Sequence, residues 1–175
     1  TSAVMIRSAC GVIDPAQTPA FNRGARDWHS DLFRECRTRN REIVVASSME
    51  LVNPPAGFGA VFYDGAIVET DVGFGSLKST HCAFVQPVLD YQKAVFGTIA
   101  DLMASEGLVP HIQMGEFLWW FFTNKTPANP GGGMAFYHPD VRAAAQAQLG
   151  RPLARFQAPT DDPARLAEGL PPARG

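Results

Sequence analysis

Two glutamates, Glu50 and Glu116, occupy similar places in two segments that have the composition of strands. Glu50 lies seven residues beyond Ile43, and Glu116 lies seven residues beyond Val109. If the two strands are parallel neighbours, about 4.8 Å apart, both carboxylates can face one cavity. Carboxyl groups about 5–5.5 Å apart suit a retaining glycosidase, and a gap of about 6.5–9.5 Å suits an inverting one. The spacing along the chain leaves both mechanisms open.

Aromatic and amide side chains near these acids fit a site for a sugar, whose C–H faces stack on rings and whose hydroxyls accept and donate hydrogen bonds. The candidate catalytic residues are Glu50 and Glu116. The candidate substrate-binding residues are Asn53, Gln113, Trp119, Trp120 and Tyr137. A glutamate at a strand end can equally serve as a structural hydrogen-bond acceptor, and the Trp119–Trp120 pair can equally belong to the core.

Other kinds of chemistry have weaker signals. The glycine-rich stretches "GFGS" and "GGG" lack the lysine and the strand–helix context of a phosphate-binding loop. We expect no metal site and no cofactor. Charged residues make up 18% of the chain and the net charge is -2, so neither nucleic acid nor a membrane is expected as a partner. The longest apolar run, "FLWWFF", is far shorter than the roughly 20 residues of a membrane span.

The elements that would position these residues alternate between helix and strand. A helix is expected from Thr18-Pro19, with an apolar stripe through Phe21, Ala25, Trp28, Leu32 and Cys36. The β-branched segment "EIVVASSMELV" predicts a strand buried on both faces, and "VFYDGAIVET" predicts a hairpin. Further helices are expected from Pro87 to Gly107 and from Pro139 to Gly150, with a strand over "LVPHIQMGEFLWWFF" between them. This order predicts an α/β fold with a parallel sheet and long insertions after the strands.

Four blocks of the sequence resemble a known kind of module: "SSMELVNPP", "DVGFGSLKSTHCAFVQPVLDYQK", "QMGEFLWWFF" and "GGGMAFYHPDVRAAAQAQLGRPL". They are similar to glycoside-hydrolase-like TIM-barrel modules of phage and prophage tail proteins, which also occur in bacterial proteins labelled fibronectin type III. The resemblance implies a (β/α)8 barrel with Glu50 and Glu116 at strand ends on its active face. A whole barrel needs about 250 residues, so residues 1–157 are expected to form a partial barrel. The Pro-, Ala- and Gly-rich residues 158–175 are expected to be a disordered tail.

Three functions fit these observations. The first is a glycan-cleaving module acting on a carbohydrate or a peptidoglycan-like glycan, and the second is a non-enzymatic structural protein of a phage tail. The third is a carbohydrate-binding module without catalysis. In each case other chains or segments would complete the barrel, and the resemblance implies a virion or extracellular location.

Overall fold

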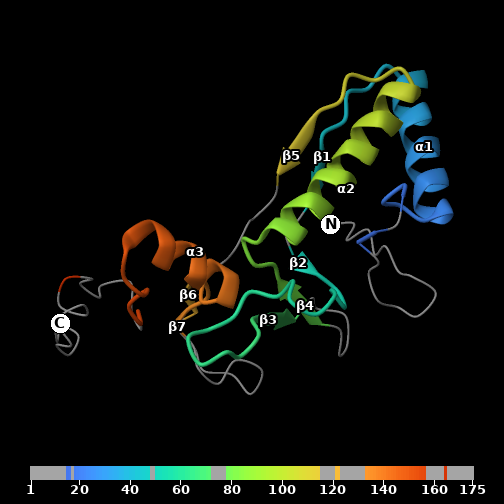
Figure 1. Cartoon of the computed structure of the whole chain (residues 1–175). Coiled ribbons are helices and arrows are strands. Elements are labelled where there is room, and N and C mark those ends of the chain that lie inside the picture. The colour runs from blue at the N-terminus through green and yellow to red at the C-terminus, as the bar shows by residue number, and fades with distance from the viewer. Residues whose placement is uncertain are drawn as a thin grey trace. The chain divides into compact units, whose positions relative to one another are not determined.

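The computed structural model describes residues 15–16, 18–47, 50–71, 78–114, 121–122, 133–156 and 164. The chain divides into two compact units (Figure 1). The first unit comprises Thr1–Gly57 and Gln86–Phe117, and the second comprises Phe58–Val85 and Leu118–Gly175. The tail predicted over residues 158–175 lies outside the described residues, apart from Ala164.

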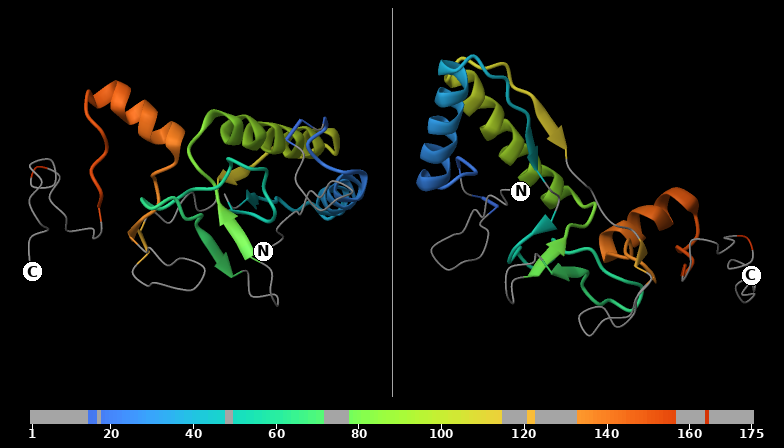
Figure 2. Two further views of the ribbon diagram at one scale, coloured as in Figure 1. Left: turned by 60° about the horizontal axis from the view of Figure 1, so that its bottom comes forward. Right: turned by 180° about the vertical axis from the view of Figure 1, so that it is seen from behind.

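The first unit pairs two helices with two parallel strands. Its elements are α1 (Arg23–Thr38), β1 (Val45–Ser47), β2 (Glu50–Leu51), α2 (Gln86–Ser105) and β5 (Ile112–Met114). β1 and β5 run parallel, with Val45 opposite Ile112 and Ser47 opposite Met114. Figure 2 shows these two strands beside α2 from two further sides. The predicted adjacency of the two parallel strands is therefore confirmed.

Helix α1 begins four residues later than a start at Pro19 would place it. The side chain of Asn22 accepts a hydrogen bond of 2.8 Å from the amide of Ala25, which satisfies one of the free N–H groups at the helix start. Asn22 rather than Thr18 is thus the N-cap, and the predicted start at Thr18-Pro19 is wrong. The predicted stripe is also partly wrong, because Trp28 is exposed and His29 is buried in its place.

The core of the first unit lies between its helices and one face of its strands. Four buried side chains form its centre: Phe21, Phe33, Ile99 and Met103. Ile43, Val45 and Ile112 pack against this centre from the strand side. The apolar period of the helix expected from Pro87 predicts a buried stripe of Val88, Tyr91, Val95, Ile99, Leu102 and Met103. Val88, Tyr91, Ile99 and Met103 are buried, and Val95 and Leu102 are half-buried. Both helices therefore cover the same face of the β1–β5 pair.

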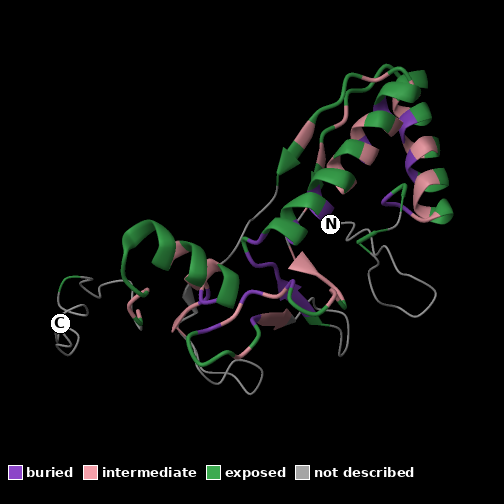
Figure 3. Cartoon of the chain, in the orientation of Figure 1, coloured by how far each residue is buried: buried purple, intermediate pink, exposed green. Residues whose placement is uncertain are grey.

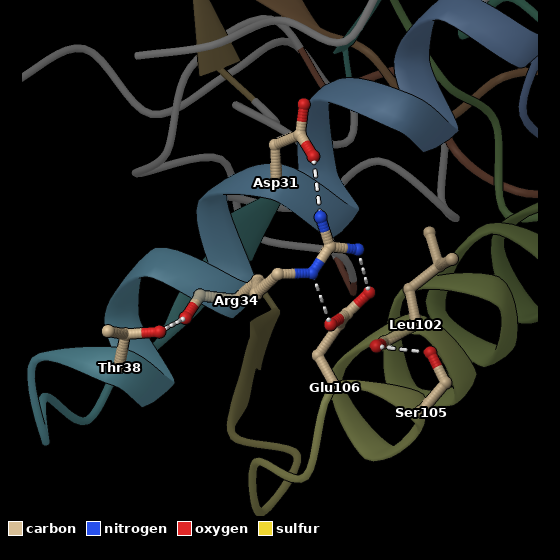
Figure 4. A network of polar contacts seen from close by, with 6 residues as sticks. All are labelled: Asp31, Arg34, Thr38, Leu102, Ser105 and Glu106. Carbon is tan, nitrogen blue, oxygen red and sulfur yellow. Dashed lines mark hydrogen bonds and ion pairs between the residues drawn. The ribbon is translucent and has the colours of Figure 1, made fainter.

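A forked ion pair joins α1 to the turn after α2 (Figure 4). Arg34 donates from Nε to Glu106 Oε2 at 3.1 Å and from its terminal nitrogen to Glu106 Oε1 at 2.8 Å. A third hydrogen bond, of 2.9 Å, reaches Asp31 one turn earlier in α1. The hydrogen bonds that Arg34 donates to Glu106, followed by the negative charge of Glu106, raise the pKa of the Arg34 guanidinium. The two parallel hydrogen bonds fix the separation and direction of the two helices at this end.

The second unit is built from antiparallel strands and one helix. β3 (Glu69–Asp71) pairs with β4 (Lys78–His81), and β6 (Phe121–Phe122) pairs with β7 (Gly133–Met134). The predicted turn at Asp64-Gly65 is confirmed. Gly65 has a φ of 89°, the amide of Ala66 donates to the Asp64 carboxylate, and Val61 bridges Ile67.

Helix α3 (Pro139–Leu149) confirms the helix predicted from Pro139 to Gly150, and it lies on the surface of this unit. His138 caps its start, and Gly150 ends it in the left-handed conformation that glycine adopts readily. None of its residues is buried (Figure 3). A core cluster of this unit is formed instead by four buried residues of the preceding segments: Ala60, Phe62, Val68 and Ala135.

The described residues therefore give an α/β fold in which one strand pair, β1–β5, is parallel and no closed barrel is present. Of the strand expected over "EIVVASSMELV", the described residues include β1 at Val45–Ser47 and β2 at Glu50–Leu51. The prediction that this strand is buried on both faces is wrong, since Val44 is 58% exposed and Ala46 is also exposed. Only the face that meets α1 and α2 is covered in the described part of the chain.

Candidate functional site

The carboxyl ends of β1 and β5 mark the place where the sequence predicts a site. Ser47 and Met114 end the two strands opposite each other, and ligands of parallel α/β folds bind beyond such ends. Glu50 lies three residues past Ser47, where it begins β2 and is half-buried. Its partner in the prediction, Glu116, lies outside the described residues, as do Trp119 and Trp120.

The two amides predicted to bind substrate are both in the first unit, and both are exposed. Asn53 has a φ of 52°, the left-handed conformation that asparagine tolerates better than most residues. This conformation turns the chain immediately before Pro54 and Pro55. Gln113 lies in β5 with its side chain on the face opposite the helices, because its neighbour Ile112 packs on the core.

In the described part of the first unit, the side of the β1–β5 pair that faces away from the helices is exposed. Val44 and Ala46 alternate with the core residues Ile43 and Val45, so they point away from the helices. We call Val44, Ala46 and Gln113 the open face. In a TIM barrel the helices form an outer ring and this side of each strand fills the interior with side chains. The open face thus has the position of a barrel interior.

Tyr137, the remaining predicted substrate-binding residue, belongs to the second unit and is only 2% exposed. Its hydroxyl donates to the carbonyl of Ala154 at 2.9 Å and accepts from the amide of Phe156 at 2.6 Å. Burial raises the pKa of the Tyr137 phenol, although the Phe156 amide and the nearby arginines oppose this shift. Both bonding directions of the hydroxyl are therefore engaged within the chain.

A cluster that the sequence reasoning missed surrounds the ring of Tyr63. The rings of Tyr63 and Tyr137 meet edge to face, with 5.0 Å between ring centroids and 84° between planes. The guanidinium carbons of Arg142 and Arg155 lie 5.0 Å and 5.1 Å from the centroid of Tyr63. We call Tyr63, Arg142 and Arg155 the arginine–tyrosine cluster. The three residues come from a hairpin, a helix and an extended segment, so no local spacing in the sequence announces them.

No group of three or more His, Cys, Asp or Glu side chains in the described part of the chain is arranged to hold a metal ion. None of the helices described is both long enough and apolar enough to cross a bilayer.

Comparison with known proteins gives one match. No curated protein and no solved structure matches the chain. Residues 5–157, however, match the family model described as the non-contractile tail sheath protein TIM barrel. This match spans most of the chain and supports the phage-tail part of the resemblance seen in the sequence. The chain therefore belongs to the TIM-barrel family of non-contractile tail sheath proteins.

Proposed function

We propose that this chain is a structural wall module of a phage tail sheath, and that it catalyses no reaction. The observation that carries the proposal is the open face of β1 and β5. Two helices cover one side of the strand pair, and the other side presents Val44, Ala46 and Gln113 to solvent. Such a surface is completed by further strands, supplied by other segments or other chains. A module of this kind contributes packing and shape to an assembly.

Glycan cleavage or binding remains the second candidate, and Glu50 is the described residue that favours it. Glu50 is half-buried as the first residue of β2, three residues past the end of β1, and acids near strand ends often act in barrels. Yet many barrels share this layout without sharing a reaction, since the fold alone does not establish an activity. Tyr137 supports glycan binding less well, because its ring and hydroxyl are engaged inside the second unit.

The test compares two alanines of the first unit that are both exposed, Ala46 in β1 and Ala94 in α2. Ala46→Arg places a charge where we expect strands to pack, and an unpaired buried charge is strongly unfavourable. Ala94→Arg adds the same side chain to a helix surface. The variants are made in the full-length protein, and assembly into tubes is followed by negative-stain electron microscopy and sedimentation.

We expect the wild type and Ala94→Arg to assemble and Ala46→Arg to remain unassembled, with circular dichroism showing that its helices persist. Assembly of Ala46→Arg at the wild-type level would contradict the proposal. In parallel, the release of reducing sugar from purified peptidoglycan and from bacterial surface polysaccharide is measured for the wild type and Glu50→Gln. Turnover by the wild type that Glu50→Gln abolishes would replace the structural role with the enzymatic one.

A further inference from the structure

The arginine–tyrosine cluster brings two positive charges together in the second unit. Tyr63 is 36% exposed, Arg155 is exposed and Arg142 is half-buried. The guanidinium carbons of Arg142 and Arg155 both lie close to the Tyr63 ring. They are therefore no more than about 10 Å apart, which is about the Debye length at 0.1 M salt. Their charges are felt together by any ion that approaches.

Neither arginine is neutralised by a carboxylate among the described residues, where no ion pair involves Arg142 or Arg155. The stretch from residue 133 to residue 156 contains three arginines and one acidic residue, Asp140. The Asp140 carboxylate lies 4.0 Å from Nδ1 of His138 rather than beside an arginine. The cluster thus keeps two positive charges that the described part of the chain leaves unbalanced.

Hydrogen bonds hold the backbone beneath both arginines in place. Arg155 lies between Ala154 and Phe156, and both of these neighbours are bonded to the single hydroxyl of Tyr137. Arg142 lies in the first turn of α3, where its amide donates to the carbonyl of His138 at 2.9 Å. A binding group whose backbone is already fixed loses less conformational entropy when it meets its ligand.

We propose that the arginine–tyrosine cluster is a docking site for a carboxylate-bearing segment of a neighbouring copy of this chain. This inference rests on the proposed function, because a sheath brings copies of one subunit into repeated contact. Guanidinium groups bind carboxylates through two parallel hydrogen bonds, and Arg and Tyr are enriched among the residues that dominate protein interfaces. The chain itself carries 17 acidic residues against 15 lysines and arginines. A second copy therefore offers the required charge, and the net negative charge disfavours nucleic acid.

The experiment removes both charges and compares the result with the removal of a third one nearby. The test variant is Arg142→Ala/Arg155→Ala, and the matched control is Arg151→Ala, an exposed arginine of the same segment that does not touch Tyr63. Self-association of the full-length protein is measured by sedimentation velocity at about 50 mM and about 500 mM salt, conditions that differ several-fold in screening length. Circular dichroism confirms that each variant is folded.

At low salt we expect the double variant to self-associate at least about tenfold more weakly than the wild type, because charged partners across an interface contribute strongly. Arg151→Ala should differ from the wild type by less than about twofold. High salt should reduce the gap between the double variant and the wild type. Arg142→Lys/Arg155→Lys, which keeps the charges and loses the planar forks, should recover only part of the association.

Two results would overturn the proposal. One is equal self-association of the wild type and the double variant at low salt. The other is binding of duplex DNA, measured by fluorescence anisotropy, that the double variant loses while its self-association is unchanged, which would assign the cluster to a phosphate backbone. Either result would leave the structural role intact if Ala46→Arg still blocks assembly, so a failure here can be told apart from a failure of the proposed function.

Discussion

The hydroxyl of Tyr137 offers the sharpest test of how the second unit is held together. Tyr137→Phe removes one oxygen and leaves the aromatic ring, so packing in the interior is preserved. Two hydrogen bonds are lost, one to the carbonyl of Ala154 and one from the amide of Phe156. Each such bond contributes about 0.5–1.5 kcal/mol, and partners left half-buried without a replacement move the cost toward the upper value. We therefore expect the free energy of unfolding to fall by about 1–3 kcal/mol.

The measurement is urea unfolding followed by far-ultraviolet circular dichroism, with thermal unfolding as a second assay. For a chain of this length the loss corresponds to a decrease in Tm of about 2–12 °C, at about 2–4 °C for each kcal/mol. The matched control is Tyr63→Phe, the same chemical change on a ring whose hydroxyl makes no hydrogen bond within the described residues. It should shift stability by less than about 0.5 kcal/mol. If the two variants unfolded at the same urea concentration, the two hydrogen bonds of the Tyr137 hydroxyl would make no net contribution to the free energy of unfolding. The reasoning would then fail.

Four further predictions concern other parts of the molecule. Gly150→Ala should lower the free energy of unfolding by about 1 kcal/mol, because Gly150 has a φ of 67°. Gly97→Ala, in α2 where an added Cβ meets no other atom, should raise it by about 0.4–1 kcal/mol. Urea unfolding compares the two variants. Met103→Ala should cost about 2–5 kcal/mol in the same assay, because Met103 is fully buried in the first core, and a loss below 1 kcal/mol would argue against that packing. Glu106→Gln should destabilise more at low salt than at high salt, while Asp27→Asn, in an exposed pair with Arg23, should have no measurable effect at either. Burial raises the pKa of Tyr137 above its value in the unfolded chain. The resulting contribution to the free energy of unfolding is complete below about pH 10 and is lost as pH rises through the folded pKa. The alkaline decline in the free energy of unfolding should therefore be shallower in Tyr137→Phe than in the wild type.

The elements that were predicted well are those whose signals are local. Helix α2 follows from a stripe that begins at Val88 and ends at Met103, and α3 follows from a proline at its start and a glycine at its end. The turn at Asp64-Gly65 follows from two residues that tolerate its backbone angles. In each case the residues that determine the structure are the residues that form it.

The start of α1 was missed because two capping signals compete there, and the later one, Asn22, makes the hydrogen bond. His29 lies in the core although a polar ring is costly to bury. The cost is reduced here, since Nδ1 of His29 donates to the carbonyl of Ala25 at 2.7 Å and the ring lies against Phe21 and Phe33. Such compensation depends on the tertiary arrangement, which the apolar period of a helix does not encode.

In the candidate site, too, the features with local sequence signals were predicted and those that depend on tertiary structure were not. The parallel pairing of β1 and β5 followed from the alternation of helices and strands, but the exposure of Ala46 did not, because a β-branched run reads alike whether one face or two are covered. The arginine–tyrosine cluster joins residues from three separate segments. Only the folded backbone brings them together.

The two hydrogen bonds to the Tyr137 hydroxyl lie close to the point where the family match ends. The family match ends at residue 157, immediately after Phe156, whose amide completes the pair of bonds. A shortened form that stops before Phe156 would deprive a buried phenol of a donor, and one that stops before Ala154 would deprive it of both partners. The useful boundary for a minimal recombinant version therefore falls after Phe156, so that both partners of the Tyr137 hydroxyl are kept.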